Sequence, residues 1–268
     1  MTKKERGYLT ELYYFALSFF VYGFLGWCTE VAYAAAKQGK FVNRGFLNGP
    51  ICPVYGIGVG VVVQFLTPVE NNLVLLYISS TILVTVIEGI TGFLLEKIFH
   101  NKWWDYSEQP LNIGGYVCVL FSLIWGVFCV LIVKIIHPLI YKVLTMIPLV
   151  LGIVVMACLA VGLLADLYVT ASGILTMNRR LEAMEKIAAE LKELSDKVGE
   201  NIYENVMEGM EFREEKKVRI EELKAKYEEM AENRTKVGER LVKAFPKMQV
   251  GQHKEIFEEL RERIKRSK

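Results

Sequence analysis

Long apolar runs alternate with short polar connections over the first two thirds of the chain. A membrane-spanning helix needs about 20 mostly apolar residues. Measured in this way, the pattern predicts five spans, at residues 12–36, 52–68, 73–98, 115–136 and 147–176. The expected fold class is therefore all-α: a polytopic transmembrane helix bundle of about five spans, followed by a soluble helical or coiled-coil arm.

Two of the apolar stretches fit this scheme poorly. The second run, residues 52–68, is barely long enough and contains Pro53, Gly56, Gly58 and Gly60. It fits either a short span or a broken, re-entrant helix, which a membrane tolerates only where protein or a water-filled cavity satisfies the backbone. Residues 135–148 are apolar but contain His137 and two prolines, and they fit an interfacial helix or a sixth span.

The last third of the chain has the composition of a soluble helix, dense in Glu, Lys, Leu and Ala from Asn178 onward. Apolar residues step by three and four here, with Arg234 filling one position, and so form a heptad seam: Ile220, Leu223, Tyr227, Met230, Val237, Leu241, Ala244 and Met248. Two antiparallel helices, or one long helix paired with another subunit, both fit. We expect a membrane domain at 1–176, a cytoplasmic coiled-coil arm at 177–268, and homo-oligomer contacts through 178–248.

Charge refines this division without changing it. Residues 1–176 contain 10 Lys and Arg against 9 Asp and Glu, and residues 177–268 contain 22 against 21. Both parts are nearly neutral, so the arm is not a polybasic tail. This argues against nucleic acid as a partner and leaves the lipid membrane as the expected one.

Basic residues near the span ends predict the orientation, because they favour the cytoplasmic side. With the amino terminus outside, eight of them fall on the cytoplasmic side: Lys37, Lys40, Arg44, Lys97, Lys102, Arg179, Arg180 and Lys186. Five fall on the other side: Lys3, Lys4, Arg6, Lys134 and Lys142. We therefore expect a multi-pass protein of the inner (cytoplasmic) membrane, with the arm in the cytoplasm.

Several classes of function lack their sequence signatures. No Walker A, Rossmann or HExxH motif occurs, so the chain is not expected to be an ATPase by itself. An ATPase subunit would have to join it in trans. The five cysteines contain no CxxC pair and fit small buried apolar residues. We expect no cofactor and no metal.

Polar residues at membrane depth are the candidates for chemistry, because ionisable groups there cost several kcal/mol unless they are paired or wetted. Glu88, Gly92 and Glu96 step by four and share one helix face. Arg44 is the most economical partner for Glu88, which we expect to be protonated at neutral pH if it stays unpaired. Asp166 is another acid in need of a partner.

The connections add further candidates. Residues 41–56 contain three glycines and two prolines, which force a non-helical backbone. Such a loop either places its side chains and backbone N–H groups around an anion or lipid head group, or forms a plain interfacial turn. The tandem pair Trp103–Trp104 fits an interfacial aromatic belt. We expect one polar pocket that binds an ion, lipid or small solute, formed by Glu30, Asn43, Arg44, Glu88, Glu96, Asp105 and Asn112.

These motifs resemble a known family. Gly26-Trp27 with Glu30, Asn43-Arg44-Gly45-Phe46-Leu47, Cys52-Pro53-Val54-Tyr55-Gly56, Glu88 with Leu95-Glu96, and Trp104-Asp105-Tyr106-Ser107 occur in the order seen in bacterial ABC-transporter type IV (CmpB-type) permeases. The resemblance covers roughly residues 15–170 and leaves the arm outside. It implies a multi-pass inner membrane protein and assigns no catalytic residues.

Three functions follow as hypotheses. The first is a permease component whose polar pocket handles an ion, lipid or small solute, with an arm that mediates assembly. The second is a membrane enzyme acting on a lipid-linked substrate, with Asp105 or Glu88 as the base and Arg44 holding a phosphate. The third is a scaffold that acts through its arm. Because His100 and His137 lie in no recognisable arrangement with Ser or Cys, we expect a non-enzyme rather than an enzyme.

Overall fold

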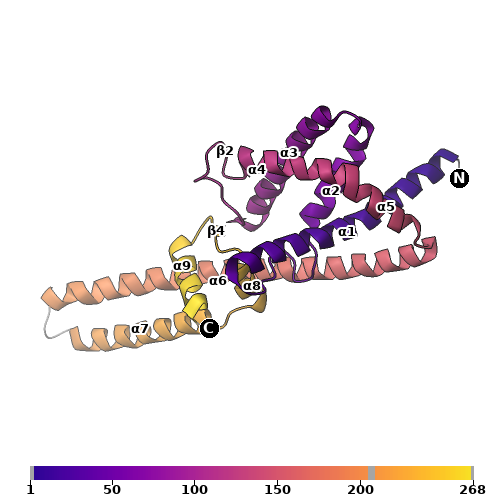
Figure 1. The fold of residues 1–268 in the computed structure, drawn as a ribbon. Coiled ribbons are helices and arrows are strands. Elements are labelled where there is room, and N and C mark those ends of the chain that lie inside the picture. The colour runs from indigo at the N-terminus through magenta and orange to yellow at the C-terminus, as the bar shows by residue number, and fades with distance from the viewer. Residues whose placement is uncertain (1–2, 205–208, 267–268) are drawn as a thin grey trace. The chain divides into compact units, whose positions relative to one another are not determined.

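The structure is a computed structural model that describes the backbone of residues 3–204 and 209–266, and the side chains of 9–197 and 215–266. The Cα positions divide it into two compact units (Figure 1). Unit 1 comprises Met1–Thr170 together with Lys243–Gln249, and unit 2 comprises Ala171–Val242 together with Val250–Lys268. Each unit is described by itself.

Unit 1 is a helical bundle. Its helices are α1 (Lys3–Gln38), α2 (Pro53–Leu66), α3 (Leu73–Phe99), α4 (Val119–Leu131), α5 (His137–Thr145) and the first part of α6 (Leu149–Glu204). Among the described residues, 4 stretches are long and apolar enough to cross a membrane: Leu9–Gln38, Leu73–Phe99, Val119–Thr145 and Leu149–Lys197. These stretches confirm the predicted class, a polytopic helical membrane protein.

The second predicted span is the short element of the bundle. Helix α2 continues into a 3-10 turn, Thr67–Val69, and together they form an apolar helix, Pro53–Val69. At 1.5 Å per residue this helix is about 25 Å long, which is less than the roughly 30 Å of a bilayer's hydrocarbon core. The helix is therefore short for a membrane span, and both predicted alternatives, a short span and a re-entrant helix, remain predictions.

Residues 135–148 form neither a separate interfacial helix nor a sixth span. A π-helix, Ile132–Ile136, joins α4 to α5, so the chain stays helical from Val119 to Thr145. Pro138 does not end the helix: it closely follows the π-helix, a local adjustment that accommodates proline inside membrane helices. The stretch is an extension of the span that begins with α4.

Two small sheets belong to the connections. β2 (Asn112–Ile113) pairs antiparallel with β3 (Val117–Cys118), with Asn112 opposite Cys118. β1 (Asn101–Lys102) pairs with β4 (Gln249–Val250), of which Gln249 belongs to unit 1. These strands fold the connection between α3 and α4 into a fixed loop.

Unit 2 contains the second part of α6, followed by α7 (Gly209–Glu232), α8 (Lys236–Ala244) and α9 (Lys254–Arg266). Its buried apolar side chains come from all four helices: Ile174, Met177, Leu181, Met184, Ile187, Leu223, Ala231, Leu241, Ile256, Phe257, Leu260 and Ile264. Arg263 of α9 donates to both carboxylate oxygens of Glu228 on α7. The unit thus has a core of its own.

The predicted heptad seam does not follow one continuous helix, so the alternative of one long helix through residues 220–248 is wrong. Helix α7 ends at Glu232 and α8 begins at Lys236. The Gly238 N–H donates to Thr235 Oγ1 at 3.2 Å, which satisfies a backbone donor of the first turn of α8 and favours a new helix start. Leu223 and Leu241 are buried within unit 2. Homo-oligomer contacts through 178–248 remain a prediction, and the side chains of 198–214 lie outside the described residues.

Candidate functional site

Glu30, eight residues before the end of α1, has two partners. Arg44 Nε lies 3.2 Å from Glu30 Oε2, and the Tyr55 hydroxyl donates to Glu30 Oε1 at 2.7 Å. The Arg44 Nε–H does not point at Glu30 Oε2, so Arg44 and Glu30 form an ion pair without a hydrogen bond at Nε. The prediction that Arg44 pairs with Glu88 is therefore wrong: Arg44 lies nearer in sequence to Glu30, on the loop that follows α1.

Glycines let Tyr55 reach Glu30. A Cβ atom added to Gly26 of α1 would lie 2.3 Å from Tyr55 Cγ, closer than two carbons can approach. A Cβ on Gly56 would lie 2.5 Å from the Phe19 carbonyl oxygen. Small residues thus bring the backbones of α1 and α2 together, as they do in membrane helix pairs. Close packing positions the phenol over the carboxylate.

Glu88, in the second half of α3, is held by a second phenol. The Tyr106 hydroxyl donates to Glu88 Oε1 at 3.3 Å. Among the residues with described side chains, no cation pairs with Glu88. Burial raises the pKa of Tyr106 above its ordinary value, and the charges of Glu88 and Glu30 raise it further. Both acids therefore act on the same phenol.

We call Glu30, Arg44, Tyr55, Glu88 and Tyr106 the acid–phenol cluster. It contains two carboxylates, each bonded to a tyrosine, and one guanidinium. The pair Glu30–Tyr55 also interacts electrostatically with the pair Glu88–Tyr106, because Tyr55 lies within electrostatic range of Tyr106. Of the seven predicted pocket residues, the structure brings Glu30, Arg44 and Glu88 into this cluster.

Glu96 belongs to the same face of α3 but has partners of its own. The Tyr116 hydroxyl donates to Glu96 Oε2 at 2.6 Å, which raises the pKa of Tyr116, and Lys102 Nζ lies 4.0 Å from the same oxygen. Between the two acids, a Cβ on Gly92 would come within 3.0 Å of Tyr116 and 3.2 Å of Trp104. The predicted acidic face thus meets the loop between α3 and α4.

Asp105 and Asn112 organise that loop. Asp105 Oδ1 accepts from the Ser107 hydroxyl at 2.6 Å and from the Ser107 N–H at 3.0 Å. The hydroxyl bond is the largest of the effects that lower the pKa of Asp105 below its ordinary value. Asn112 Nδ2 donates to the carbonyl oxygens of Ser107 and Gln109. Both predicted residues therefore shape the loop that carries Tyr106.

Asn43 does the same for the loop before α2. Its Oδ1 accepts from Trp27 Nε1 at 2.7 Å, and its Nδ2 donates to the Asn48 carbonyl oxygen at 2.7 Å. The sequence signal for this role was the run of glycines and prolines around it. Asn43 fixes the backbone on which Arg44 approaches Glu30.

The anion that this loop binds comes from the chain itself. Asp166 Oδ1 accepts from the Asn48 N–H at 3.1 Å and from Asn48 Nδ2 at 2.8 Å, and Asp166 Oδ2 accepts from the Gly49 N–H at 2.6 Å. The Thr170 hydroxyl adds a bond to Oδ1 at 3.2 Å. Asp166 thus finds its partner in the loop predicted to hold an anion.

The interfacial-belt explanation is wrong for Trp103, whose side chain is buried, and stays a prediction for Trp104. Trp103 is 4% exposed and packs edge-on against Phe46 and Phe245, with ring centroids 5.1 and 5.3 Å away. Trp104 Nε1 donates to the Tyr116 carbonyl oxygen at 2.9 Å. Aromatic residues at this position form a small core under the loop, since three distant segments converge there.

One contact had no sequence signal. The Tyr22 hydroxyl lies 3.0 Å from His137 Nδ1, and Tyr22 is 4% exposed. The two residues are far apart in the sequence and belong to α1 and to the first turn of α5. They hold these helices together at a polar point outside the acid–phenol cluster.

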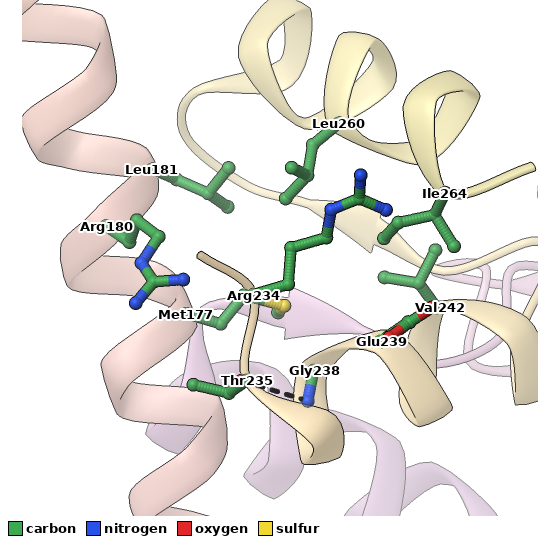
Figure 2. Close-up of a pocket in the computed structure, with 10 residues that line it drawn as sticks. All are labelled: Met177, Arg180, Leu181, Arg234, Thr235, Gly238, Glu239, Val242, Leu260 and Ile264. Carbon is green, nitrogen blue, oxygen red and sulfur yellow. Dashed lines mark hydrogen bonds between the residues drawn. The ribbon is translucent and has the colours of Figure 1, made fainter. Parts of the chain in front are cut away.

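Unit 2 contains a small pocket of about 20 Å³, which holds roughly one water molecule. Figure 2 shows the Arg234 side chain extending between Leu260 and Ile264 of α9, with Arg180 on the side of α6. No group of three or more His, Cys, Asp or Glu suited to a metal ion occurs among the described side chains.

Comparisons with known proteins agree with the membrane fold. The family described as "Putative ABC-transporter type IV" matches residues 17–171. This range covers more than half of the chain and includes every residue of the acid–phenol cluster. No curated protein and no solved structure matches the chain.

Proposed function

Because this chain belongs to the ABC-transporter type IV family, we propose that its acid–phenol cluster carries a cation or a proton within a membrane transporter component. The family and the 4 apolar stretches fit such a component. The identity of the cargo is our inference from the cluster.

The proposal rests on the partner of Glu88, which is a phenol and not a cation. Arg44 compensates Glu30, whereas Glu88 has the Tyr106 phenol as its bond partner. An ionised carboxylate at membrane depth costs several kcal/mol unless it gains a positive charge. Glu88 therefore favours taking up a proton or a cation, and Tyr106 supports either form because a phenol both donates and accepts hydrogen bonds.

Two parts of the proposal concern partners. The chain contains no Walker A motif, so we propose that an ATPase subunit joins it in trans to drive transport against a gradient, whereas the cluster passes protons down a gradient without it. We also propose that unit 2 is a cytoplasmic arm of an inner membrane protein, which is the side where that ATPase would work. The basic residues near the span ends support this orientation.

The enzymatic hypothesis gains no support from the geometry. Arg44 is engaged by Glu30 instead of being presented to a phosphate. Asp105 is bonded to Ser107 and Gln249 and has the lowered pKa of a poor base. These contacts leave the transport function as the better explanation.

A flux measurement tests the proposal. The full chain is reconstituted in liposomes that contain a pH-sensitive dye, and a potassium diffusion potential drives proton entry. We expect flux above the liposome leak for the natural sequence and a loss of at least tenfold for Glu88→Gln, because the amide keeps the shape of the side chain but binds no proton. Arg44→Ala is expected to lose flux as well, since Glu30 loses its counter-charge.

The matched control is Glu70→Gln. Glu70 follows the 3-10 turn Thr67–Val69 and lies outside the acid–phenol cluster. It should retain the flux of the natural sequence. Equal flux in Glu88→Gln and Glu70→Gln, with both proteins folded and inserted, would contradict the proposed role of the cluster, as would flux at the leak level in the natural sequence.

A further inference from the structure

A short segment from the last third of the chain belongs to the membrane unit. Residues Lys243–Gln249 belong to unit 1. The first two of them are the last two residues of α8, and the rest of α8 belongs to unit 2. Ala244 and Met248 are each 0% exposed. We call residues 243–249 the strap.

The strap contacts the loop between α3 and α4 at two side chains. The Phe245 ring packs edge-on against Trp103 at 5.3 Å between centroids. Gln249 Nε2 donates to Asp105 Oδ2 at 2.9 Å, the carboxylate oxygen that Ser107 leaves open.

The contacted residues directly precede Tyr106. Trp103 and Asp105 lie three and one positions before this phenol, which donates to Glu88. The far side of the loop is fixed from within, because the Tyr106 N–H donates to the Gly115 carbonyl oxygen at 2.9 Å. The strap therefore holds the part of the loop that precedes Tyr106. Its attachment should influence the position of the Tyr106 hydroxyl.

We propose that the strap regulates the acid–phenol cluster: Phe245 and Gln249 are positioning residues that hold Tyr106 against Glu88. This inference rests on the proposed function, because it assigns a control element to the same site. The strap continues directly from α8, so a partner that binds or moves α8 acts on Tyr106 through a few residues of chain. Release of Gln249 frees Asp105 Oδ2 and loosens the loop.

Opposite charges at one exposed position test the attachment. Gln249→Glu places a carboxylate against Asp105 and is expected to release the strap, whereas Gln249→Lys forms an ion pair with Asp105 and is expected to keep it. Hydrogen exchange of amides 101–116 is measured on the full chain in detergent. We expect exchange about tenfold faster in Gln249→Glu, as loss of a bond together with repulsion predicts, and unchanged or slower exchange in Gln249→Lys.

The ring contact has its own matched pair. Phe245→Ala removes the contact with Trp103, and Lys247→Ala shortens an exposed side chain of the same strap. Faster exchange of 101–116 in the first variant alone supports the strap. Equal exchange in Gln249→Glu and Gln249→Lys, or in Phe245→Ala and Lys247→Ala, would overturn it.

Proton flux separates this inference from the proposed function. Regulation requires that Gln249→Glu changes the flux, or shifts its pH profile, relative to Gln249→Lys. If Glu88→Gln abolishes flux while both Gln249 variants retain it unchanged, the proposed function stands and regulation by the strap is refuted. If Glu88→Gln retains full flux, the proposed function and its regulation both fail, while the exchange data still decide whether the strap is attached.

Discussion

Replacing Asp166 with Ala is expected to destabilise unit 1 more than removal of any other single carboxylate. Three donors from Asn48 and Gly49 lose their acceptor at once. A polar group left unsatisfied in the interior costs about 1–3 kcal/mol, and partial exposure of the site reduces this, so we expect a total near 3 kcal/mol. The loop before α2 should then lose its attachment to α6, and with it the placement of Arg44.

Thermal unfolding in detergent, followed by circular dichroism, measures this effect. Asp166→Asn keeps one acceptor oxygen and should fall between the natural sequence and Asp166→Ala. Glu193→Ala removes an exposed acid from the same helix and serves as the control. The interpretation of the loop as a receptor for Asp166 would be refuted if Asp166→Ala unfolded at the temperature of Glu193→Ala.

The second large effect is expected for Gly26→Val. Even the first added carbon would lie 2.3 Å from Tyr55 Cγ and 2.4 Å from its Cβ, so α1 and α2 have to separate. Overpacking of this kind costs about 1–3 kcal/mol. Because the separation also withdraws Tyr55 from Glu30, we expect the proton flux to fall together with the stability.

Gly162→Val is the matched control for this variant. Gly162 lies in the interior of α6, and a Cβ there has nothing within 4 Å. The same substitution at this position should change neither the unfolding temperature nor the flux appreciably. If the two valine variants behaved alike, close packing at Gly26 would not be what positions Tyr55.

The spans could be predicted from the sequence because they depend on a local property. A run of about 20 apolar residues is visible without knowledge of its neighbours. The same reasoning identified the second run as unusual, and α2 is indeed short. It also identified residues 41–52 as non-helical, since glycine and proline act on the backbone next to them. The prediction was wrong for residues 53–56, which form the first turn of α2, where Pro53 is tolerated at the helix start.

The pairing of polar residues could not be predicted in this way. Asp166 and Asn48 are 118 positions apart, and nothing in either segment indicates the other. Arg44 had several acids as possible partners, and the structure pairs it with Glu30 of the preceding helix. Trp103 shows the same limit, because its sequence context is equally typical of an interfacial belt and of a small aromatic core.

The prediction of a heptad seam on one long helix was wrong for a different reason. The apolar spacing predicted that the side chains of Leu223 and Leu241 are buried, and they are. Spacing alone does not distinguish one long helix from two shorter ones that bury the same side chains. At the break the Thr235 hydroxyl accepts the Gly238 N–H, a side-chain cap that a periodic apolar pattern does not reveal.

Labelling with dicyclohexylcarbodiimide tests the central claim, that Glu88 takes up a proton inside the membrane unit. This apolar reagent modifies protonated carboxyl groups in apolar surroundings, and peptide mass spectrometry locates the product. We predict modification of Glu88 that decreases as the pH rises, with little at Glu96, which has Lys102 and Tyr116 beside it. Absence of label at Glu88, or labelling of Glu88 that does not change with pH, would contradict the account.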